Sequence, residues 1–506
     1  MEYRKIFRAA ELKALDEYTI RHEPVSDVEL MERAATAFTN RLLQLYPVAN
    51  SFNILAGTGN NGGDGFAIAR QLMARGKHAR VYLARVGEEL SPCCAVNRER
   101  FREVGGEEEE AREFAPGRGE VWVDALFGSG LNRPTGGWVA DAIRRLNDMK
   151  ATVVAVDVPS GLMCDDNREN GGEIVRATRT LTFHCPKLAL MLEESHGYAG
   201  EFEVLDIGLS REGERRLPSS LFYLTREAVA GSLPRVDKFA HKGRRGHALL
   251  VAGSDRFAGA AALATRGALR SGAGLVTVHV PKGLKGLMHA SAPEALVSVD
   301  ADDGHFTGIG TWPGCDAVGI GPGMGTDPES AAATRALLER WRGPTVVDAD
   351  ALNVLAANPE WLEGLPRESV LTPHAAEFDR LSGRVAASGR ERLEALVAFA
   401  RRYRVHVVLK GAHAVVATPG GECFFNMTGN AGMAKGGTGD VLTGVIASVL
   451  AGGAPLPGAV TASVFAHGLA GDLAAAEHGE RGVTSGDVAA MMGRAWRVLE
   501  EVSRDK

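Results

Sequence analysis

The segment Lys435-Gly436-Gly437-Thr438-Gly439-Asp440 is followed directly by the largely apolar residues 441–447. The glycines let the chain turn tightly and bring its N–H groups close to a ligand. Because the apolar stretch predicts a helix, those N–H groups would lie at the helix start, where the helix dipole favours an anion. There the Asp440 carboxylate could take a proton from a hydroxyl that accepts a phosphoryl group. The alternative is a plain glycine turn in which Asp440 only caps the helix.

The composition is typical of a globular protein with two or three domains. The chain has 506 residues, of which 45% are hydrophobic and 24% are charged, and its net charge is −6. This charge argues against nucleic acid or an anionic membrane as a partner. The six cysteines show no CxxC spacing and the N-terminus has no signal-peptide pattern, so we expect reduced thiols in a cytoplasmic protein. Residues 441–471 carry no formal charge, but Gly452, Gly453 and Pro455 interrupt them, so we expect two buried helices rather than a membrane span.

The first half of the chain alternates short apolar strands with helices. A strand at 52–56 is followed by a glycine-rich loop at 57–65 and a helix at 66–74, and further strands are predicted at 79–84, 121–126 and 152–156. This alternation predicts a parallel, doubly wound sheet, in which ligands bind beyond the carboxyl ends of the strands. We interpret residues 211–234, which show charge runs and no clear periodicity, as the connection between domains.

Several polar side chains follow the strands of this half. Asn61, Asp64, Asp124, Asp157 and Ser160 could converge at one edge of the sheet, and their oxygen atoms suit a cation. Each of them alone could instead be a cap or turn residue. Lys187 also follows a strand and is a candidate proton carrier or phosphate contact, or else a surface lysine.

The second half repeats the pattern. Strands are predicted at 247–252, 275–280, 317–320, 345–347, 370–371 and 405–409, and each ends in a loop of small or polar residues. A second α/β domain follows from this alternation, and its last phosphate-binding loop is the segment 435–440.

Read together, the two halves resemble the bifunctional NAD(P)H-hydrate repair enzymes, in which an NAD(P)HX epimerase is fused to an ADP-dependent NAD(P)H-hydrate dehydratase. The resemblance covers nearly the whole chain. It is carried by the motifs GTGNNGGDG at 57–65, DALFGSGL at 124–131, DVPSGL at 157–162, GPGMG at 321–325, DADAL at 348–352, LTPHAAEF at 371–378, LKGAH at 409–413 and GGTGD at 436–440.

The resemblance implies a Rossmann-like, doubly wound epimerase domain over residues 1–212. In that domain Asp157 would lie beside the altered ring, with Asp157 and Lys187 as candidate proton-transfer residues. A potassium ion would be bound by Asn61, Asp124 and Ser160. The hydrated dinucleotide would be held by Asn60, Asn61, Gly62, Gly63, Asp64, Gly128, Ser129, Gly130, Leu131, Asn132, Arg133, Pro134 and Asp157.

The resemblance also implies a ribokinase-like dehydratase domain over residues 225–506. Asp440 would be the catalytic base, Mg²⁺ the required ion and ADP the phosphoryl donor, with AMP and phosphate as products. Only the resemblance points to ADP rather than ATP. Ala260, Gly323, His374 and Asp440 would contact the hydrate, while Lys410, Gly411, Ala412, His413, Ala414 and Gly439 would bind the nucleotide.

Phosphorylation explains why such a fold would serve a dehydratase. The hydroxyl at C6 of the damaged nicotinamide ring leaves poorly as hydroxide, whereas a phosphate there can be expelled by the electrons of the ring nitrogen. The partners would therefore be the small molecules NADHX, NADPHX and ADP, and we expect a homo-oligomer. Two alternatives stay open: a ribokinase-type small-molecule kinase fused to a nucleotide-binding domain, and a first domain that binds ligand without catalysis.

Overall fold

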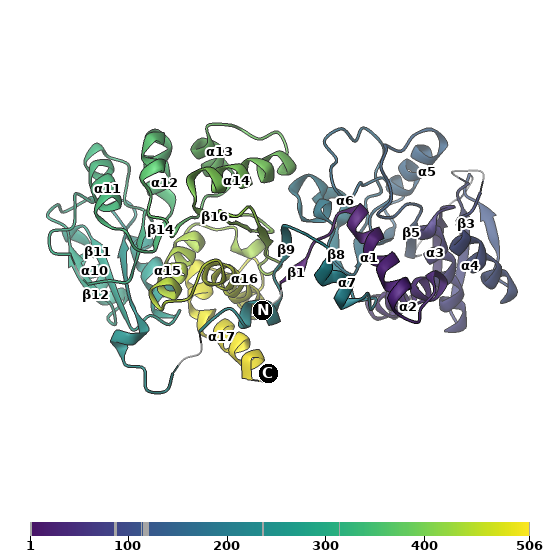
Figure 1. The fold of residues 1–506 in the computed structure, drawn as a ribbon, viewed down its shortest axis with the longest axis horizontal. Coiled ribbons are helices and arrows are strands. Elements are labelled where there is room, and N and C mark those ends of the chain that lie inside the picture. Colours follow the sequence, from purple (N-terminus) through teal and green to yellow (C-terminus); the bar gives the residue numbers. More distant parts are fainter. Residues whose placement is uncertain are drawn as a thin grey trace. The chain divides into compact units, whose positions relative to one another are not determined.

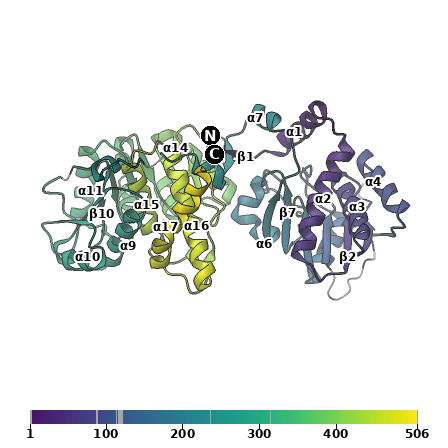
Figure 2. The ribbon, with the colours of Figure 1, turned by 90° about the horizontal axis from the view of Figure 1, so that it is seen from below.

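The computed structural model describes residues 3–85, 89–112, 114, 121–234, 237–312 and 314–504. The chain divides into two compact units. The N-terminal unit contains residues 5–219 together with 388–390, and the C-terminal unit contains residues 220–387 and 391–506 together with the residues up to Arg4. Figures 1 and 2 label the elements of both units.

The N-terminal unit is built on a parallel sheet with the strand order β4-β3-β2-β5-β6-β7-β8 among its described residues. Chain order reverses between the neighbours β2 and β5, which makes this the place where a doubly wound sheet binds its ligand. The elements are α1 (Ala9–His22), α2 (Asp27–Leu45), β2 (Ser51–Ala56), α3 (Asn60–Ala74), β3 (His78–Leu83), α4 (Pro92–Glu103), β4 (Glu108–Glu110), β5 (Val121–Ala125), α5 (Gly137–Asp148), β6 (Thr152–Val156), β7 (Arg179–Phe183), α6 (His196–Ala199), β8 (Glu201–Leu205) and α7 (Arg211–Arg216).

The C-terminal unit has a longer sheet with the strand order β1-β9-β18-β17-β16-β15-β14-β13-β10-β11-β12. The run from β16 to β12 is parallel, whereas β17 is antiparallel to both of its neighbours. Chain order reverses between β10 and β13. The strands are β1 (Arg4–Lys5), β9 (Leu221–Tyr223), β10 (His247–Val251), β11 (Leu275–Val280), β12 (Leu296–Val299), β13 (Ala317–Ile320), β14 (Thr345–Val347), β15 (Ser369–Leu371), β16 (His406–Leu409), β17 (Val415–Ala417) and β18 (Cys423–Phe425). The helices are α8 (Arg226–Ala230), α9 (Ala258–Leu269), α10 (Lys285–Ser291), α11 (Pro328–Arg340), α12 (Ala349–Ala357), α13 (Ala375–Ser382), α14 (Gly389–Tyr403), α15 (Thr438–Ala451), α16 (Gly458–His478) and α17 (Ser485–Arg504).

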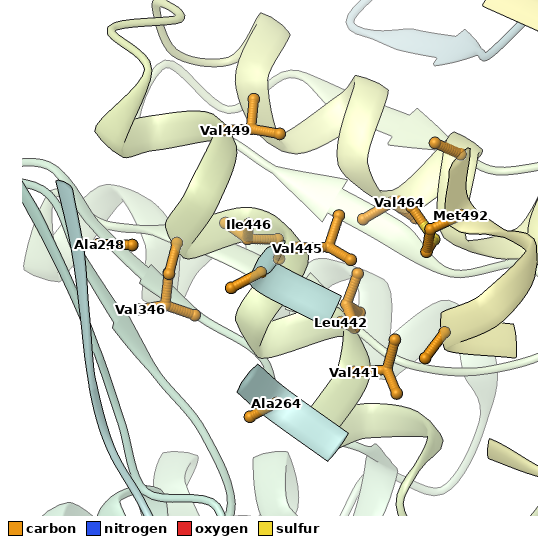
Figure 3. Close-up of a cluster of buried hydrophobic side chains, with 14 of the residues drawn as sticks. Ala248, Ala264, Val346, Val441, Leu442, Val445, Ile446, Val449, Val464 and Met492 are labelled. Carbon is orange, nitrogen blue, oxygen red and sulfur yellow. The ribbon is translucent and has the colours of Figure 1, made fainter. Parts of the chain in front are cut away.

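Helix α15, which follows the segment 435–440, lies at the centre of the core of this unit. Its residues from Val441 to Ala451 are all buried. Val441, Leu442 and Val445 pack in one apolar cluster with side chains from the sheet and from neighbouring helices (Figure 3). Close packing is possible because Gly444 lies against the backbone of α9, where an added Cβ would come within 1.9 Å of the Ala264 carbonyl oxygen. A helix packed this tightly holds its first turn in a fixed place.

The structure differs from two sequence-based boundaries. Helix α3 begins at Asn60, inside the segment predicted as a loop, because residues 60–65 form its first turns. The division between the two units, after Ser219, falls within residues 211–234. These residues are more than a linker, because they contain α7, β9 and α8, and β9 joins the C-terminal sheet by pairing with β18. A three-residue strand whose partner lies about 200 residues away leaves no periodic signal.

The apolar stretch at 441–471 forms α15 and most of α16, as two helices rather than one. Helix α16 has the length and composition of a membrane span, but 72% of that window is buried within the protein. The core helix of a globular protein passes the same test.

Candidate active sites

A cavity of about 900 Å³ lies at the carboxyl ends of the strands in the N-terminal unit, where chain order reverses between β2 and β5. The loops after β2, β5, β6 and β7 line it, together with α1 and α2. Most of the residues predicted for the epimerase site meet there: Asn60, Asn61, Asp64, Gly128, Ser129, Gly130, Leu131, Asn132, Arg133, Asp157 and Lys187.

Three predicted contacts do not line this cavity. Gly62 and Gly63 lie buried in the first turns of α3, and Pro134 lies beyond the lining part of its loop. A Cβ on Gly62 would come within 1.8 Å of the Gly57 carbonyl oxygen, so packing of the turn explains this glycine.

Asp157 and Lys187 form a buried ion pair in the cavity wall, with 2.5 Å between Nζ and Oδ1. Lys187 Nζ also donates to Thr182 Oγ1 at 3.0 Å and to the Phe183 carbonyl at 2.8 Å. The same Asp157 oxygen accepts from Phe183 N–H at 3.0 Å. Burial lowers the pKa of Lys187, but the charge of Asp157 and the nearby thiols outweigh it, so the net shift is upward and the ammonium keeps its proton. This geometry suits Lys187 to holding Asp157 in place rather than to giving up a proton.

The residues predicted for potassium converge beneath the same cavity. Asp124 accepts from Ser160 N–H at 2.7 Å and from Ser160 Oγ at 2.5 Å. Asn61 Nδ2 donates to the Phe127 carbonyl at 2.9 Å, which leaves Asn61 Oδ1 as an acceptor. Burial raises the pKa of Asp124 to about 6, against the hydrogen bonds from Ser160 that lower it. Amide, hydroxyl, carbonyl and carboxylate oxygens are a donor set that fits K⁺.

In the C-terminal unit, the segment 435–440 forms the start of α15 as predicted. Gly437 is the N-cap with φ +91°, so Asp440 lies three positions inside the helix and is not its cap. Asp440 has no hydrogen bond or ion pair with the residues that the structure describes. Burial and the neighbouring Asp348 raise its pKa to about 6, although Lys410 acts in the opposite direction. A carboxylate without a partner and with a raised pKa is suited to proton transfer near neutral pH.

Lys410 faces this helix start from the end of β16. Its Nζ lies 2.9 Å from Asp348 Oδ1 and 3.7 Å from Glu377 Oε2. Asp348 is 1% exposed and also accepts from Thr443 Oγ1 on α15 at 2.7 Å. A Cβ on Gly439 would lie 3.3 Å from Lys410 Nζ. The cation therefore lies against the first turn of α15, where it adds to the positive end of the helix dipole.

The predicted hydrate contacts lie on loops that border this centre. A Cβ on Gly323 would meet that of Ala260 at 2.9 Å, so these two residues touch. In the same loop, Gly325 N–H donates to Asp350 at 2.9 Å. His374 caps α13 by accepting from Glu377 N–H at 3.3 Å, and it forms a β-bridge with Lys410. Gly411, Ala412, His413 and Ala414 form the turn between β16 and β17.

Sequence reasoning assigned no role to three residues of these sites: Asp16, Asp348 and Glu377. Asp348 follows β14 directly, and Glu377 is three residues after the end of the loop that follows β15, so their position after a strand was the available signal. Asp16 lies within α1, and no local pattern shows that this helix reaches the cavity.

Two α/β units, each with polar groups beyond the carboxyl ends of its parallel strands, define the protein as an enzyme with a Rossmann-like unit and a ribokinase-like unit. Residues 27–189 match the family described as YjeF-related protein N-terminus, and residues 248–493 match NAD(P)H-hydrate dehydratase. The bifunctional NAD(P)H-hydrate repair enzyme of Moorella thermoacetica is 37% identical over 514 residues, with 97% of each chain covered. The chain belongs to the family of bifunctional NAD(P)H-hydrate repair enzymes.

Other relatives agree with this assignment. The repair enzyme of Thermofilum pendens is 34% identical, covering 98% of this chain and 97% of its own. A ribokinase-like superfamily protein from Enterococcus faecalis has 25% identity and a TM-score of 0.50, covering 56% of this chain and 98% of its own. The predicted family and fold class are thus confirmed. The match of residues 27–189 to the YjeF-related family argues against the alternative of a ribokinase-type kinase fused to a nucleotide-binding domain. The individual site residues and the domain limits 1–212 and 225–506 stay predictions.

Proposed function

We propose that this protein repairs hydrated NADH and NADPH. The N-terminal unit interconverts the R and S hydrates at C6, and the C-terminal unit converts the S hydrate to NAD(P)H, with ADP as phosphoryl donor and AMP and phosphate as products. The observation that carries the proposal is Asp440, which lies in the first turn of α15 beside the Lys410–Asp348 pair and has no hydrogen-bond partner among the described residues.

In the dehydratase, Asp440 would take the proton of the C6 hydroxyl as that oxygen attacks the terminal phosphorus of the donor. The N–H groups of residues 437–439 and the Lys410 ammonium would stabilise charge on the transferring phosphoryl group. The electrons of the ring nitrogen then break the C6–O bond, phosphate leaves, and loss of the C5 proton restores the dihydropyridine. The predicted contacts Ala260, Gly323 and His374 border this space and would hold the hydrate.

Magnesium would supply charge neutralisation on the phosphates of the donor. The residues nearest to Lys410 do not enclose an ion by themselves, because Asp348 is engaged by Lys410 and Thr443, and Glu377 by His374 N–H. Phosphate and water oxygens would therefore complete the coordination, as is usual for Mg²⁺.

In the epimerase, Asp157 would act on the altered ring as a carboxylate that Lys187 holds in place. A potassium ion on Asn61, Asp124 and Ser160 would fix the loops after β2, β5 and β6, which surround the cavity. The open polar loop from Gly128 to Arg133 would bind the dinucleotide phosphates.

We further propose that the protein acts in the cytoplasm as a homo-oligomer, with small molecules rather than nucleic acid or membranes as partners. The net charge of −6 and the burial of α16 support the proposal that neither nucleic acid nor a membrane is a partner.

The test is the recovery of absorbance at the reduced-nicotinamide wavelength. Purified S hydrate with Mg²⁺ and either ADP or ATP should give NADH, with ADP the better donor, and R hydrate should give NADH only after epimerisation. Consumption of donor with a stable phosphorylated alcohol as the product, and no NADH, would support the kinase alternative instead.

A further inference from the structure

Asp16 lies on α1 and lines the same cavity as Asp157 and Lys187. Its carboxyl group has no hydrogen bond or ion pair with the described part of the chain. Asp157, in contrast, accepts hydrogen bonds from Lys187, Phe183 N–H and Thr182 Oγ1. These two of the carboxyl groups that line the cavity therefore lie in opposite environments: donors hold Asp157, and Asp16 has none among the described residues.

Inversion at C6 requires an acid and a base. The C6 hydroxyl leaves as water only after it receives a proton, and the water that adds to the opposite face must lose one. Lys187 is a poor acid here, because its ammonium group is engaged by Asp157, by Thr182 and by the carbonyl groups of Phe183 and Cys185. Asp157 in its ion pair suits the base, so the acid must come from another group.

We propose that Asp16 is the general acid that protonates the C6 hydroxyl, with Asp157 as the general base on the other face of the ring. This inference rests on the proposed epimerase activity. The ring nitrogen donates its electron pair as the C6–O bond breaks, water leaves, and an iminium forms. A second water adds to the opposite face of C6 and gives a proton to Asp157. One water is lost and one gained, the ring is neither oxidised nor reduced, and a proton has passed from Asp16 to Asp157.

The surroundings of Asp16 favour its protonated form. Burial and the negative charge of Asp157 raise its pKa to about 7, against the charge of Lys187. When the surroundings keep one carboxyl protonated and its neighbour ionised at the same pH, the two can act as an acid–base pair. The charged or titratable side chains that line this cavity are Lys13, Asp16, Glu17, Asp27, Asp64, Cys93, Arg133, Asp157, His184 and Lys187.

Asp64 is the nearest competitor for this role. It lies on α3, and burial together with Asp157 and Asp16 raises its pKa well above the usual range. Asp64 lines the same cavity as Asp16, so the Asp64→Asn variant decides between the two carboxyl groups.

The test follows interconversion of separated R and S NADHX by the full chain without nucleotide, for wild type, Asp16→Asn, Asp16→Glu and Asp64→Asn. We expect kcat of Asp16→Asn to fall by about 10²–10⁴ with KM little changed. Asp16 must carry a proton to act as the acid, and Asp157 must be deprotonated to act as the base. The wild-type rate should therefore fall as the pH rises above about 7, where Asp16 loses its proton. That fall should be absent in Asp16→Asn and present in Asp16→Glu, which should keep its rate within tenfold of wild type. Glu99→Gln, an exposed carboxyl on α4, is the matched control.

Three results would overturn the proposal. The first is an interconversion rate of Asp16→Asn within tenfold of wild type, and the second is an Asp16→Glu variant as inactive as Asp16→Asn. The third is loss of interconversion in Asp64→Asn while Asp16→Asn stays active. Dehydration of S NADHX with ADP and Mg²⁺ should be unchanged in every variant. If wild type itself does not accelerate interconversion above background, the epimerase function fails, and this outcome is distinct from a failure of the role of Asp16.

Discussion

At the scale of single residues, the proposed role of Asp440 as the catalytic base of the C-terminal unit can be tested by substitution. Replacing Asp440 by Asn removes the base but keeps the shape of the side chain. We expect dehydration of the S hydrate to fall by about 10²–10⁴, since this is the usual contribution of a general base. Absorbance at the reduced-nicotinamide wavelength measures the loss, and unchanged epimerisation serves as the internal control. Dehydration within tenfold of wild type would remove Asp440 from this role.

The same residue predicts a pH dependence. The pKa of Asp440 is raised to about 6 by burial and by Asp348, and only the deprotonated carboxylate acts as a base. The rate of dehydration should therefore rise with pH through about 6 and then level off. A pH–rate profile for S hydrate at saturating ADP and Mg²⁺ tests this. A rate that is flat between pH 5 and pH 7 would contradict the prediction.

Lys410 and Asp348 should be coupled in stability as well as in function. Lys410→Met leaves the buried Asp348 carboxylate without its cation, and we expect the free energy of unfolding to fall by about 3 kcal/mol. The double variant with Asp348→Asn should lose less than the sum of the single losses, because the two side chains interact directly. Urea denaturation of the four proteins measures this, and simple additivity would show that the pair contributes nothing.

At the scale of elements, the start of α15 depends on one glycine. Gly437 has φ +91°, and a Cβ there would lie 2.4 Å from Leu263 Cδ1, whereas a Cβ on Gly436 would meet nothing within 4 Å. Gly437→Ala should therefore lower stability by about 1–3 kcal/mol and reduce dehydration by displacing Asp440, while Gly436→Ala should cost much less. Thermal unfolding and dehydratase assays of the two variants test this. Equal effects would show that backbone conformation is not the reason for Gly437.

A second prediction at this scale concerns the proposed potassium site on the loops after β2, β5 and β6. If Asn61, Asp124 and Ser160 bind K⁺, replacing K⁺ by the smaller Li⁺ should slow epimerisation, because Li⁺ cannot reach all of these oxygens at once. Dehydration by the C-terminal unit should not change. Both rates can be measured with one preparation at constant ionic strength, and an unchanged epimerase rate would exclude a potassium site.

At the scale of the whole molecule, the first residues of the chain belong to the C-terminal unit. The Tyr3 ring lies 4.7 Å from that of Phe424, and its hydroxyl is 2.9 Å from Thr461 Oγ1. Tyr3→Ala should lower the free energy of unfolding of the C-terminal unit by about 2 kcal/mol, through lost aromatic packing. Differential scanning calorimetry measures this loss of stability, and the loss of dehydratase activity on heating shows that the transition belongs to the C-terminal unit. Phe239→Ala, at a ring that is 86% exposed, is the control and should change stability little.

Much of the fold could be predicted from local patterns. The bounds expected for β6, β11, β13 and β14 are those observed, because short apolar runs between glycine, proline or polar residues form buried parallel strands. The start of α3 was misplaced, since six residues rich in glycine have low helix propensity and only packing keeps them helical. Strand β9 was missed because its pairing with β18 is not local.

Residue order alone was sufficient for the fold class, the family and the position of Asp440, because each depends on short segments whose glycines and carboxylates have a direct local consequence. Only the folded chain brings Asp16 from α1 to the cavity of Asp157 and Lys187, and Asp348 to Lys410. These neighbours are set by which helix packs on which strand. That packing is decided by the burial of apolar faces contributed by distant segments, and no local pattern contains it.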